Sequence, residues 1–188
     1  MKLTFKNDTF KILQIADTQE GRKVSPDTLA LINAALDREE PDLVVYSGDQ
    51  IWGRGFHGDV NQVRRVLKEL TAPVVERHLP FAICFGNHDR QVGLDNRAQF
   101  EIYKEIPGFI GEDTPGVDGV GNCVLEIADG DRPGYLLYLI DSHSSLKVGY
   151  DHVHQNQIDW YRGVRDSYEK QYGHSLRCHS AHSRVRGV

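Results

Sequence analysis

Cysteine and long apolar runs are the scarcest features of this 188-residue chain. Its three cysteines, Cys84, Cys123 and Cys178, are widely spaced and form no CxxC or zinc-ribbon pattern. This spacing predicts buried, reduced thiols rather than a disulfide framework or a structural zinc site. No apolar run is long enough to span a bilayer, and the N-terminus lacks the apolar region of a signal peptide. We therefore expect a cytoplasmic protein with no membrane partner.

The chain also has no excess of positive charge. Its formal net charge is −5, with 39% hydrophobic and 26% charged residues, which is typical of one globular domain. This balance argues against a protein that coats nucleic acid, although bound metal ions can still hold a small anionic substrate. The sequence does not indicate an oligomeric state.

Three apolar segments each stop abruptly at polar residues. Residues 10–16, 43–47 and 80–85 have the length and apolarity of strands that are covered on both faces of a parallel sheet. The polar residues that follow them are Asp17, then Gly48-Asp49, then Gly86-Asn87-His88-Asp89. In open α/β sheets, ligands bind at the carboxyl ends of the strands. Taken singly, each motif fits an ordinary turn equally well, because glycine and asparagine are common turn formers.

The residue types in these motifs are typical of a metal site. Aspartate, asparagine and histidine supply the oxygen and imidazole donors that divalent and trivalent metals use in proteins. An aspartate between two ions can bridge them. The ordered set therefore predicts a metal centre at one edge of the sheet.

The first half of the chain predicts alternating strands and helices. Serine, proline and aspartate at 25–27 are three agreeing signals for a helix start, and that helix ends before Pro41. Apolar residues over 63–70 predict a second amphipathic helix, broken at Pro73. With the three strands, this gives a β-α-β-α-β unit in a parallel sheet with right-handed crossovers.

The second half follows a different pattern. A helix over 94–106 and a glycine-rich and proline-rich loop over 107–121 precede two strands, 122–128 and 135–140, which we expect to pair antiparallel. A mixed sheet follows from this pairing. Residues 155–172 predict another helix. Residues 177–188 have no strand or helix periodicity, so we predict one domain over 1–176 followed by an aperiodic tail.

The ordered motifs resemble the calcineurin-like metallophosphoesterase superfamily, whose signature is DxH, GDxx, GNH[DE], H and GHxH. The resemblance covers about the first two-thirds of the chain. Within the superfamily, the sequences around the motifs are most similar to the branch of purple acid phosphatases and Dcr2-type phosphatases. The resemblance implies an α/β fold, a metallophosphoesterase-like βαβαβ sandwich with mixed sheets.

The resemblance also implies a ligand set for a binuclear metal centre. Asp17 would bind the first metal, Asp49 would bridge both, and Asn87 would bind the second. Gln19 stands where the family has the histidine of DxH. Its amide oxygen is a weaker donor than imidazole, so weaker binding at the first metal is expected.

Two further residues would take part in catalysis by the same resemblance. His88 would lie beside the substrate phosphate, and Asp89 would orient its imidazole through the other ring nitrogen. The implied reaction is hydrolysis of a small phosphomonoester or phosphodiester by a metal-bound hydroxide. The implied cofactors are two divalent or trivalent ions of manganese, iron or zinc.

One departure from the family leaves the activity of this chain open. It contains no GHxH, and the sequence after Leu176 does not continue as an apolar strand, which predicts a truncation or frameshift. The alternative hypothesis is a non-catalytic fragment or binding module that keeps the fold without a complete metal centre. A nucleotide-binding domain would need a glycine-rich phosphate loop, which residues 17–21 do not provide. Spacing alone gives no ligand role to His57, His78, His143, His152, His154 or His174.

Overall fold

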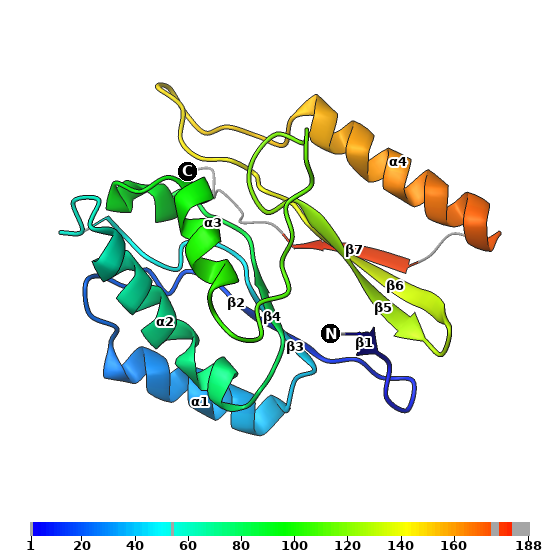
Figure 1. Ribbon diagram of the computed structural model, residues 1–188, viewed down its shortest axis with the longest axis horizontal. Helices are drawn as coiled ribbons and strands as arrows, with labels where there is room; N and C mark the ends of the chain where they lie inside the picture. Colours follow the sequence, from blue (N-terminus) through cyan, green and yellow to red (C-terminus); the bar gives the residue numbers. More distant parts are fainter. Residues whose placement is uncertain (1, 54, 174–176, 182–188) are drawn as a thin grey trace.

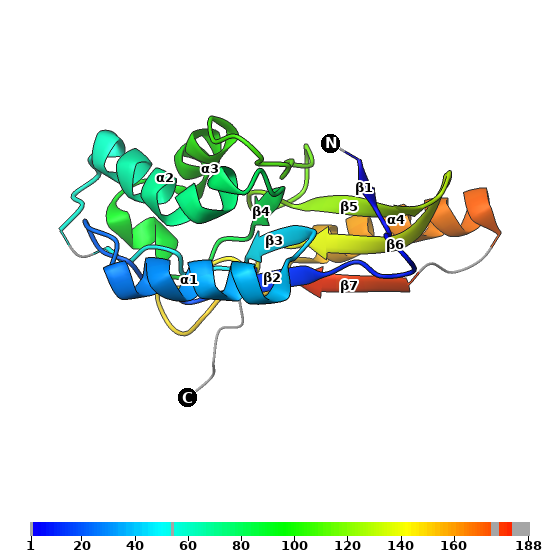
Figure 2. The same ribbon diagram turned by 90° about the horizontal axis from the view of Figure 1, so that it is seen from below.

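The computed structural model describes residues 2–53, 55–173 and 177–181. These residues form two β-sheets packed face to face, with helices on both outer sides (Figure 1). Figure 2 shows the same layers from a second direction, with α1, α2 and α3 on the side of the first sheet and α4 on the side of the second. The predicted α/β sandwich with mixed sheets is confirmed.

The first sheet is entirely parallel and has the strand order β2-β3-β4. Its strands are β2 (Ile12–Ile15), β3 (Leu43–Tyr46) and β4 (Phe81–Ile83). Helices α1 (Pro26–Glu39) and α2 (Val60–Glu76) connect them. The β-α-β-α-β prediction is therefore confirmed, and all three strands lie within their expected ranges.

The second sheet is mixed and has the order β1-β5-β6-β7. Its strands are β1 (Leu3–Thr4), β5 (Cys123–Asp129), β6 (Arg132–Leu139) and β7 (Arg177–Ala181). β5 and β6 pair antiparallel, as predicted, whereas β1 runs parallel to β5 and β7 parallel to β6. The hairpin turn is tighter than expected, because Asp129 already pairs with Arg132.

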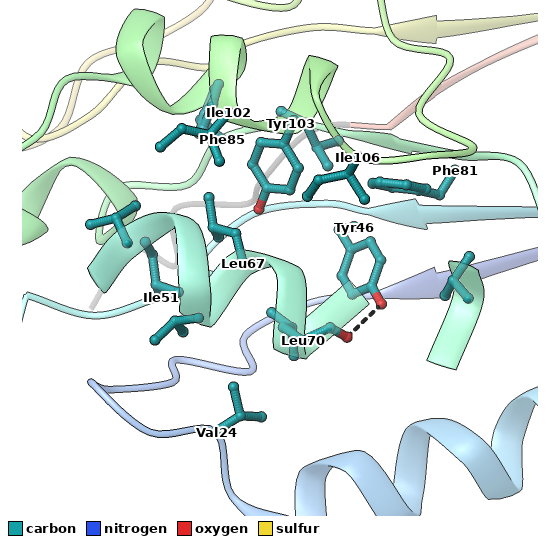
Figure 3. Close-up of a cluster of buried hydrophobic side chains, with 14 of the residues drawn as sticks. Val24, Tyr46, Ile51, Leu67, Leu70, Phe81, Phe85, Ile102, Tyr103 and Ile106 are labelled. Carbon is teal, nitrogen blue, oxygen red and sulfur yellow. Dashed lines mark hydrogen bonds between the residues drawn. The ribbon is translucent and has the colours of Figure 1, made fainter. Parts of the chain in front are cut away.

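Successive side chains of β3 point to opposite faces of the first sheet, and the core accordingly consists of two clusters. Val44 and Tyr46 point toward the helices, and Leu43 and Val45 pack against the second sheet. In the first cluster the hydroxyl of Tyr46 donates a hydrogen bond to the carbonyl of Leu70 at 3.2 Å, which ties β3 to α2 (Figure 3). The strands that carry the candidate site are therefore fixed from both faces.

Helix α2 does not break at Pro73, contrary to the sequence prediction. It continues to Glu76, with Pro73 and Val74 both buried. The hydroxyl of Thr71 bonds to the carbonyl of Leu67 at 2.8 Å within the same stretch. Burial of the helix against the first sheet outweighs the backbone hydrogen bond that a proline removes.

The remaining helices flank the two sheets. A short 3-10 helix (Asp89–Val92) and α3 (Asn96–Lys104) lie on the side of α1 and α2. Helix α4 (Gln155–Tyr172) covers the outer face of the second sheet, where Tyr138 of β6 contacts Trp160 and Tyr161. Among the described residues, no helix is both long enough and apolar enough to cross a membrane.

The expectation of an aperiodic segment from residue 177 onward is wrong for 177–181. These residues form β7, because the edge of β6 offers free backbone groups that a short polar segment can pair with. Residues 182–188, the rest of that segment, lie outside the described residues.

Candidate metal and phosphoester site

The loops after β2 and β3 meet at the carboxyl edge of the first sheet. The backbone N–H of Asp17 donates to the carbonyl of Gly48 at 3.0 Å, and that of Gln19 donates to the carbonyl of Asp49 at 2.8 Å. The loop after β4 joins them, because the N–H of His88 donates to the carboxylate of Asp49 at 2.8 Å. All three sequence motifs therefore lie together at one edge, as predicted.

Three of the expected ligands have a left-handed backbone. The φ angles of Asp17, Gln19 and Asp49 are 56°, 47° and 54°. Such angles are uncommon outside glycine and carry a conformational cost, and they concentrate at functional sites. Hydrogen bonds between the loops after β2 and β3 hold the backbone in this conformation and offset the cost.

Asp49 is the most enclosed of the expected ligands, with 7% of its surface exposed. Burial raises the pKa of its carboxyl group, and the nearby charge of Asp17 raises it further, whereas the hydrogen bond from the His88 N–H opposes the rise. A Cβ atom on Gly86 would lie 2.1 Å from Oδ1 of Asp49. Glycine is therefore required at position 86 to let the β4 loop approach this carboxylate.

Asp89 does not orient the imidazole of His88, which corrects the expectation from the resemblance. Its Oδ2 accepts hydrogen bonds from the backbone N–H of Gly86 at 2.7 Å and of Asp49 at 2.9 Å, and its Oδ1 accepts from Ile51 at 3.1 Å. Burial raises the pKa of Asp89 to about 7, although these backbone donors favour the ionised form. Asp89 therefore holds the β3 and β4 loops together.

The ring of His88 is positioned by packing. It lies 5.5 Å from the ring of Trp52, centroid to centroid, with the two planes tilted by 52°. Its Nδ1 is buried and has no hydrogen-bond partner among the described residues. Trp52 was not among the predicted site residues, although its place directly after Gly48-Asp49, in a glycine-rich loop, is a signal that points to it.

The side chains at this edge fit a divalent cation. Asp17 is exposed, and Gln19 and Asn87 are half-buried, so their oxygens remain accessible from solvent. Two carboxylates and two amide oxygens form a set of oxygen donors suited to divalent ions such as manganese. A cation would also offset the repulsion between Asp17 and Asp49.

A two-sheet sandwich whose parallel strands end in Asp, Gly-Asp and Gly-Asn-His-Asp defines the class of metallophosphoesterase-like proteins. The model of one family, described as calcineurin-like phosphoesterase, matches residues 10–179. The chain belongs to this family. The match extends into β7, well beyond the first two-thirds that the motifs covered.

Curated relatives are consistent with this assignment. The chain is 31% identical over 185 residues to "Phosphatase DCR2" of Saccharomyces cerevisiae, covering 84% of this chain and 32% of that protein. It is 28% identical over 195 residues to "Probable inactive purple acid phosphatase 14" of Arabidopsis thaliana, covering 85% of this chain and 48% of that one. The chain thus spans only a third to a half of the length of these relatives.

A solved structure has a similar fold. A dimetal phosphatase from Danio rerio superposes with a TM-score of 0.63, covering 92% of this chain and 69% of that chain. The sequence identity is 14%, so the likeness concerns the fold alone. Dimetal phosphatases of this fold use two metal ions.

Proposed function

We propose that this chain hydrolyses small phosphomonoesters or phosphodiesters in a metal-dependent reaction at the edge formed by Asp17, Asp49 and Asn87. The observation that carries the proposal is the left-handed backbone shared by Asp17, Gln19 and Asp49 at the ends of two adjacent parallel strands. Ordinary turns have no need of three such residues in two neighbouring loops that hydrogen bonds join.

Four side chains would hold the ions in this proposal. Asp17 and Gln19 would bind the first, Asn87 the second, and Asp49 both. Two such ions, of manganese, iron or zinc, would neutralise phosphate charge and lower the pKa of an attacking water. The buried carboxylate of Asp49 is suited to a bridging position, because its Oδ1 and backbone are already fixed by the β4 loop.

His88 would donate a proton to the leaving oxygen of the substrate. Its ring is held against Trp52, so its direction is restricted before substrate binds. Asp89 would act as a positioning residue, since its carboxylate bonds to the backbone of the loops that carry His88 and Asp49. Trp52 would also exclude water from one side of the imidazole.

The cytoplasm is the proposed location of this reaction. Two buried cysteines that carry thiols, Cys84 and Cys123, support it, and both lie in the same core cluster. Reduced thiols in a core are typical of proteins from reducing compartments.

A second candidate is a metal-binding module without turnover. Gln19 favours it, since an amide oxygen replaces an imidazole beside an exposed Asp17. The description of an Arabidopsis relative as a probable inactive phosphatase is consistent with it. The two candidates share metal binding and differ only in hydrolysis.

Calorimetric titration with Mn²⁺ tests the shared part. We expect the wild-type chain to bind Mn²⁺ and Asp49→Asn to lose that binding, because Asn removes the charge of the bridging ligand. Asp17→Ala should weaken binding less. Asp131→Asn, at the exposed hairpin turn, is the matched control and should bind as wild type does. Equal binding by wild type and Asp49→Asn would refute the proposed site.

A further inference from the structure

A second group of metal-ligating side chains lies outside the proposed phosphoester site. One ring nitrogen of His143, one of His154 and one carboxylate oxygen of Asp151 all lie within 4.8 Å of one another. The residues belong to the segment between the end of β6 and the first turn of α4, which is drawn in yellow in Figure 1. The two imidazole rings are stacked, with centroids 4.0 Å apart and planes 21° from parallel.

Both ring nitrogens of His154 lie within hydrogen-bond distance of a carboxylate. Its Nδ1 lies 2.9 Å from Oδ2 of Asp118, to which it donates a hydrogen. The Nε2 nitrogen lies 3.2 Å from Oδ1 of Asp151, so a cation bound between these two atoms would take the place of the proton that they share. A carboxylate on the outer nitrogen of a histidine is the usual way proteins orient a ligating imidazole.

The tautomer of His143 is fixed by the side-chain amide of Gln157, which is fully buried. The amide nitrogen of Gln157 donates to the carbonyl of Asp141 at 2.7 Å and to Oδ1 of Asn122 at 3.0 Å. Its Oε1 therefore accepts from the backbone N–H of His154 at 2.7 Å and from the ring Nε2 of His143 at 3.0 Å. The Nδ1 nitrogen of His143 is thus left with its lone pair.

The backbone also presents His143 in a strained form. Its φ is 64°, in the left-handed region, and its N–H donates to Oδ1 of Asp141 at 2.8 Å. His143 and Asp151 line a cleft of about 360 Å³ that also contains Arg90. The cleft leaves room for water to complete a coordination shell on the open side.

We propose that His143, Asp151 and His154 form a binding site for a borderline divalent cation of the zinc class, distinct from the Asp17–Asp49–Asn87 site. Two imidazole nitrogens and one carboxylate match the ligand types of such ions, with one position left for water. Bonds of about 2.0–2.1 Å put tetrahedral ligand atoms roughly 3.3 Å apart. The ligand atoms here lie within 4.8 Å of one another, so binding needs their separations to shrink by up to about 1.5 Å in this half-buried group.

A cation at this site would hold the segment after β6 in place next to the loop that carries Asn87. The hydroxyl of Ser144, next to His143, lies 3.5 Å from the carbonyl of Asn87. The cation would therefore fix the position of this segment beside the phosphoester site without entering it. The inference does not rest on the proposed hydrolysis.

Zinc binding in the Asp49→Asn chain tests the inference, because that background lacks the bridging ligand of the other site. Titration with Zn²⁺, and with Co²⁺ followed by visible absorption, should show one tight equivalent. His143→Ala and His154→Ala should each weaken it at least 100-fold. His78→Ala should leave it unchanged, since His78 is exposed and lies outside the group.

Asp118→Ala provides an independent readout that a mere loss of folding would not give. Asp118 is exposed, so its removal should leave the fold intact, while zinc affinity falls by about 10- to 100-fold. Far-ultraviolet circular dichroism of each metal-free variant checks the fold. The proposal is overturned if the Asp49→Asn chain binds no zinc, or if a folded His143→Ala or His154→Ala variant binds it equally well.

Discussion

The backbone N–H of Asp49 donates to the carboxylate of Asp89 at 2.9 Å, so the proposed bridging ligand is held by a residue 40 positions further along the chain. The carboxylate of Asp49 in turn accepts from the N–H of His88, which immediately precedes Asp89. The two aspartates therefore link the loops after β3 and β4 in both directions. This reciprocal contact makes the geometry of the site depend on Asp89.

Asp89→Asn should destabilise the protein. Both carboxylate oxygens of Asp89 accept hydrogen bonds from backbone N–H groups, Oδ1 from Ile51 and Oδ2 from Gly86 and Asp49. In asparagine one of these oxygens becomes an NH₂ group, which cannot accept, so the N–H groups on that side lose their acceptor. We expect a loss of about 1–3 kcal/mol in the free energy of unfolding, measured with urea. The exposed Asp131→Asn should change it by less than about 0.5 kcal/mol. Equal stability of the two variants would contradict a structural role for Asp89.

Gly86→Ala should displace the carboxylate of Asp49. The new methyl group would lie 2.1 Å from Oδ1 and 2.4 Å from the backbone nitrogen of Asp49. We expect a cost of about 1–3 kcal/mol in unfolding free energy and a clear loss of Mn²⁺ affinity. Gly163→Ala, in α4 with nothing within 4 Å of the added atom, is the control and should be neutral or stabilising. Unchanged Mn²⁺ binding by Gly86→Ala would count against Asp49 as a ligand.

Gln19→His should strengthen metal binding. Position 19 has the φ of 47° that histidine tolerates better than most residues, and imidazole is a stronger donor than an amide oxygen. We expect about tenfold tighter Mn²⁺ binding by calorimetry, equivalent to about 1.4 kcal/mol. Gln171→His, at the exposed end of α4, should have no effect. A weaker affinity in Gln19→His would show that this side chain does not face the metal.

Lowering the pH should remove a small stabilising contribution from the carboxylate of Asp42, the residue before β3. Burial raises the pKa of Asp42, but hydrogen bonds from Lys6 and the N–H of Lys11 outweigh it and hold the pKa below its ordinary value of 3.8. The contribution is therefore present above pH 3.8 and lost as pH falls through the lowered pKa. Because Lys6 is exposed, it amounts to at most about 1 kcal/mol.

Urea unfolding of wild type and Asp42→Asn at a series of pH values measures this contribution. The difference in unfolding free energy between the two proteins should be constant at neutral pH and shrink below about pH 4. A difference that does not change with pH would show that the charge of Asp42 contributes nothing.

The sequence predicts the sheet that carries the site because its strands are uniformly apolar and end at polar residues. Ser25 likewise predicts the start of α1, where its hydroxyl accepts from the N–H of Asp27 at 3.2 Å. Local patterns of this kind are visible along the chain. They identified Asp17, Asp49 and Asn87 as neighbours at one edge.

Features that depend on distant contacts were not predictable in this way. The partners of Asp89 include residues 38 and 40 positions away, so its hydrogen bonds cannot be derived from the Gly-Asn-His-Asp motif. β7 is polar and forms through backbone pairing with β6, and α2 tolerates Pro73 because it is buried. The orientation of His143 by Gln157 depends on packing between β5, β6 and α4, which spacing does not show.

The most direct test of the account is hydrolysis of bis(p-nitrophenyl) phosphate by the purified 188-residue chain with and without Mn²⁺. We expect slow turnover that requires Mn²⁺ and stops with EDTA, because the four proposed ligands include no imidazole. Asp49→Asn should abolish this turnover, His88→Ala should lower it by about 10²–10⁴, and Asp131→Asn should retain it. No Mn²⁺-dependent turnover by wild type, or equal turnover by Asp49→Asn, would contradict a phosphoesterase centred on Asp49.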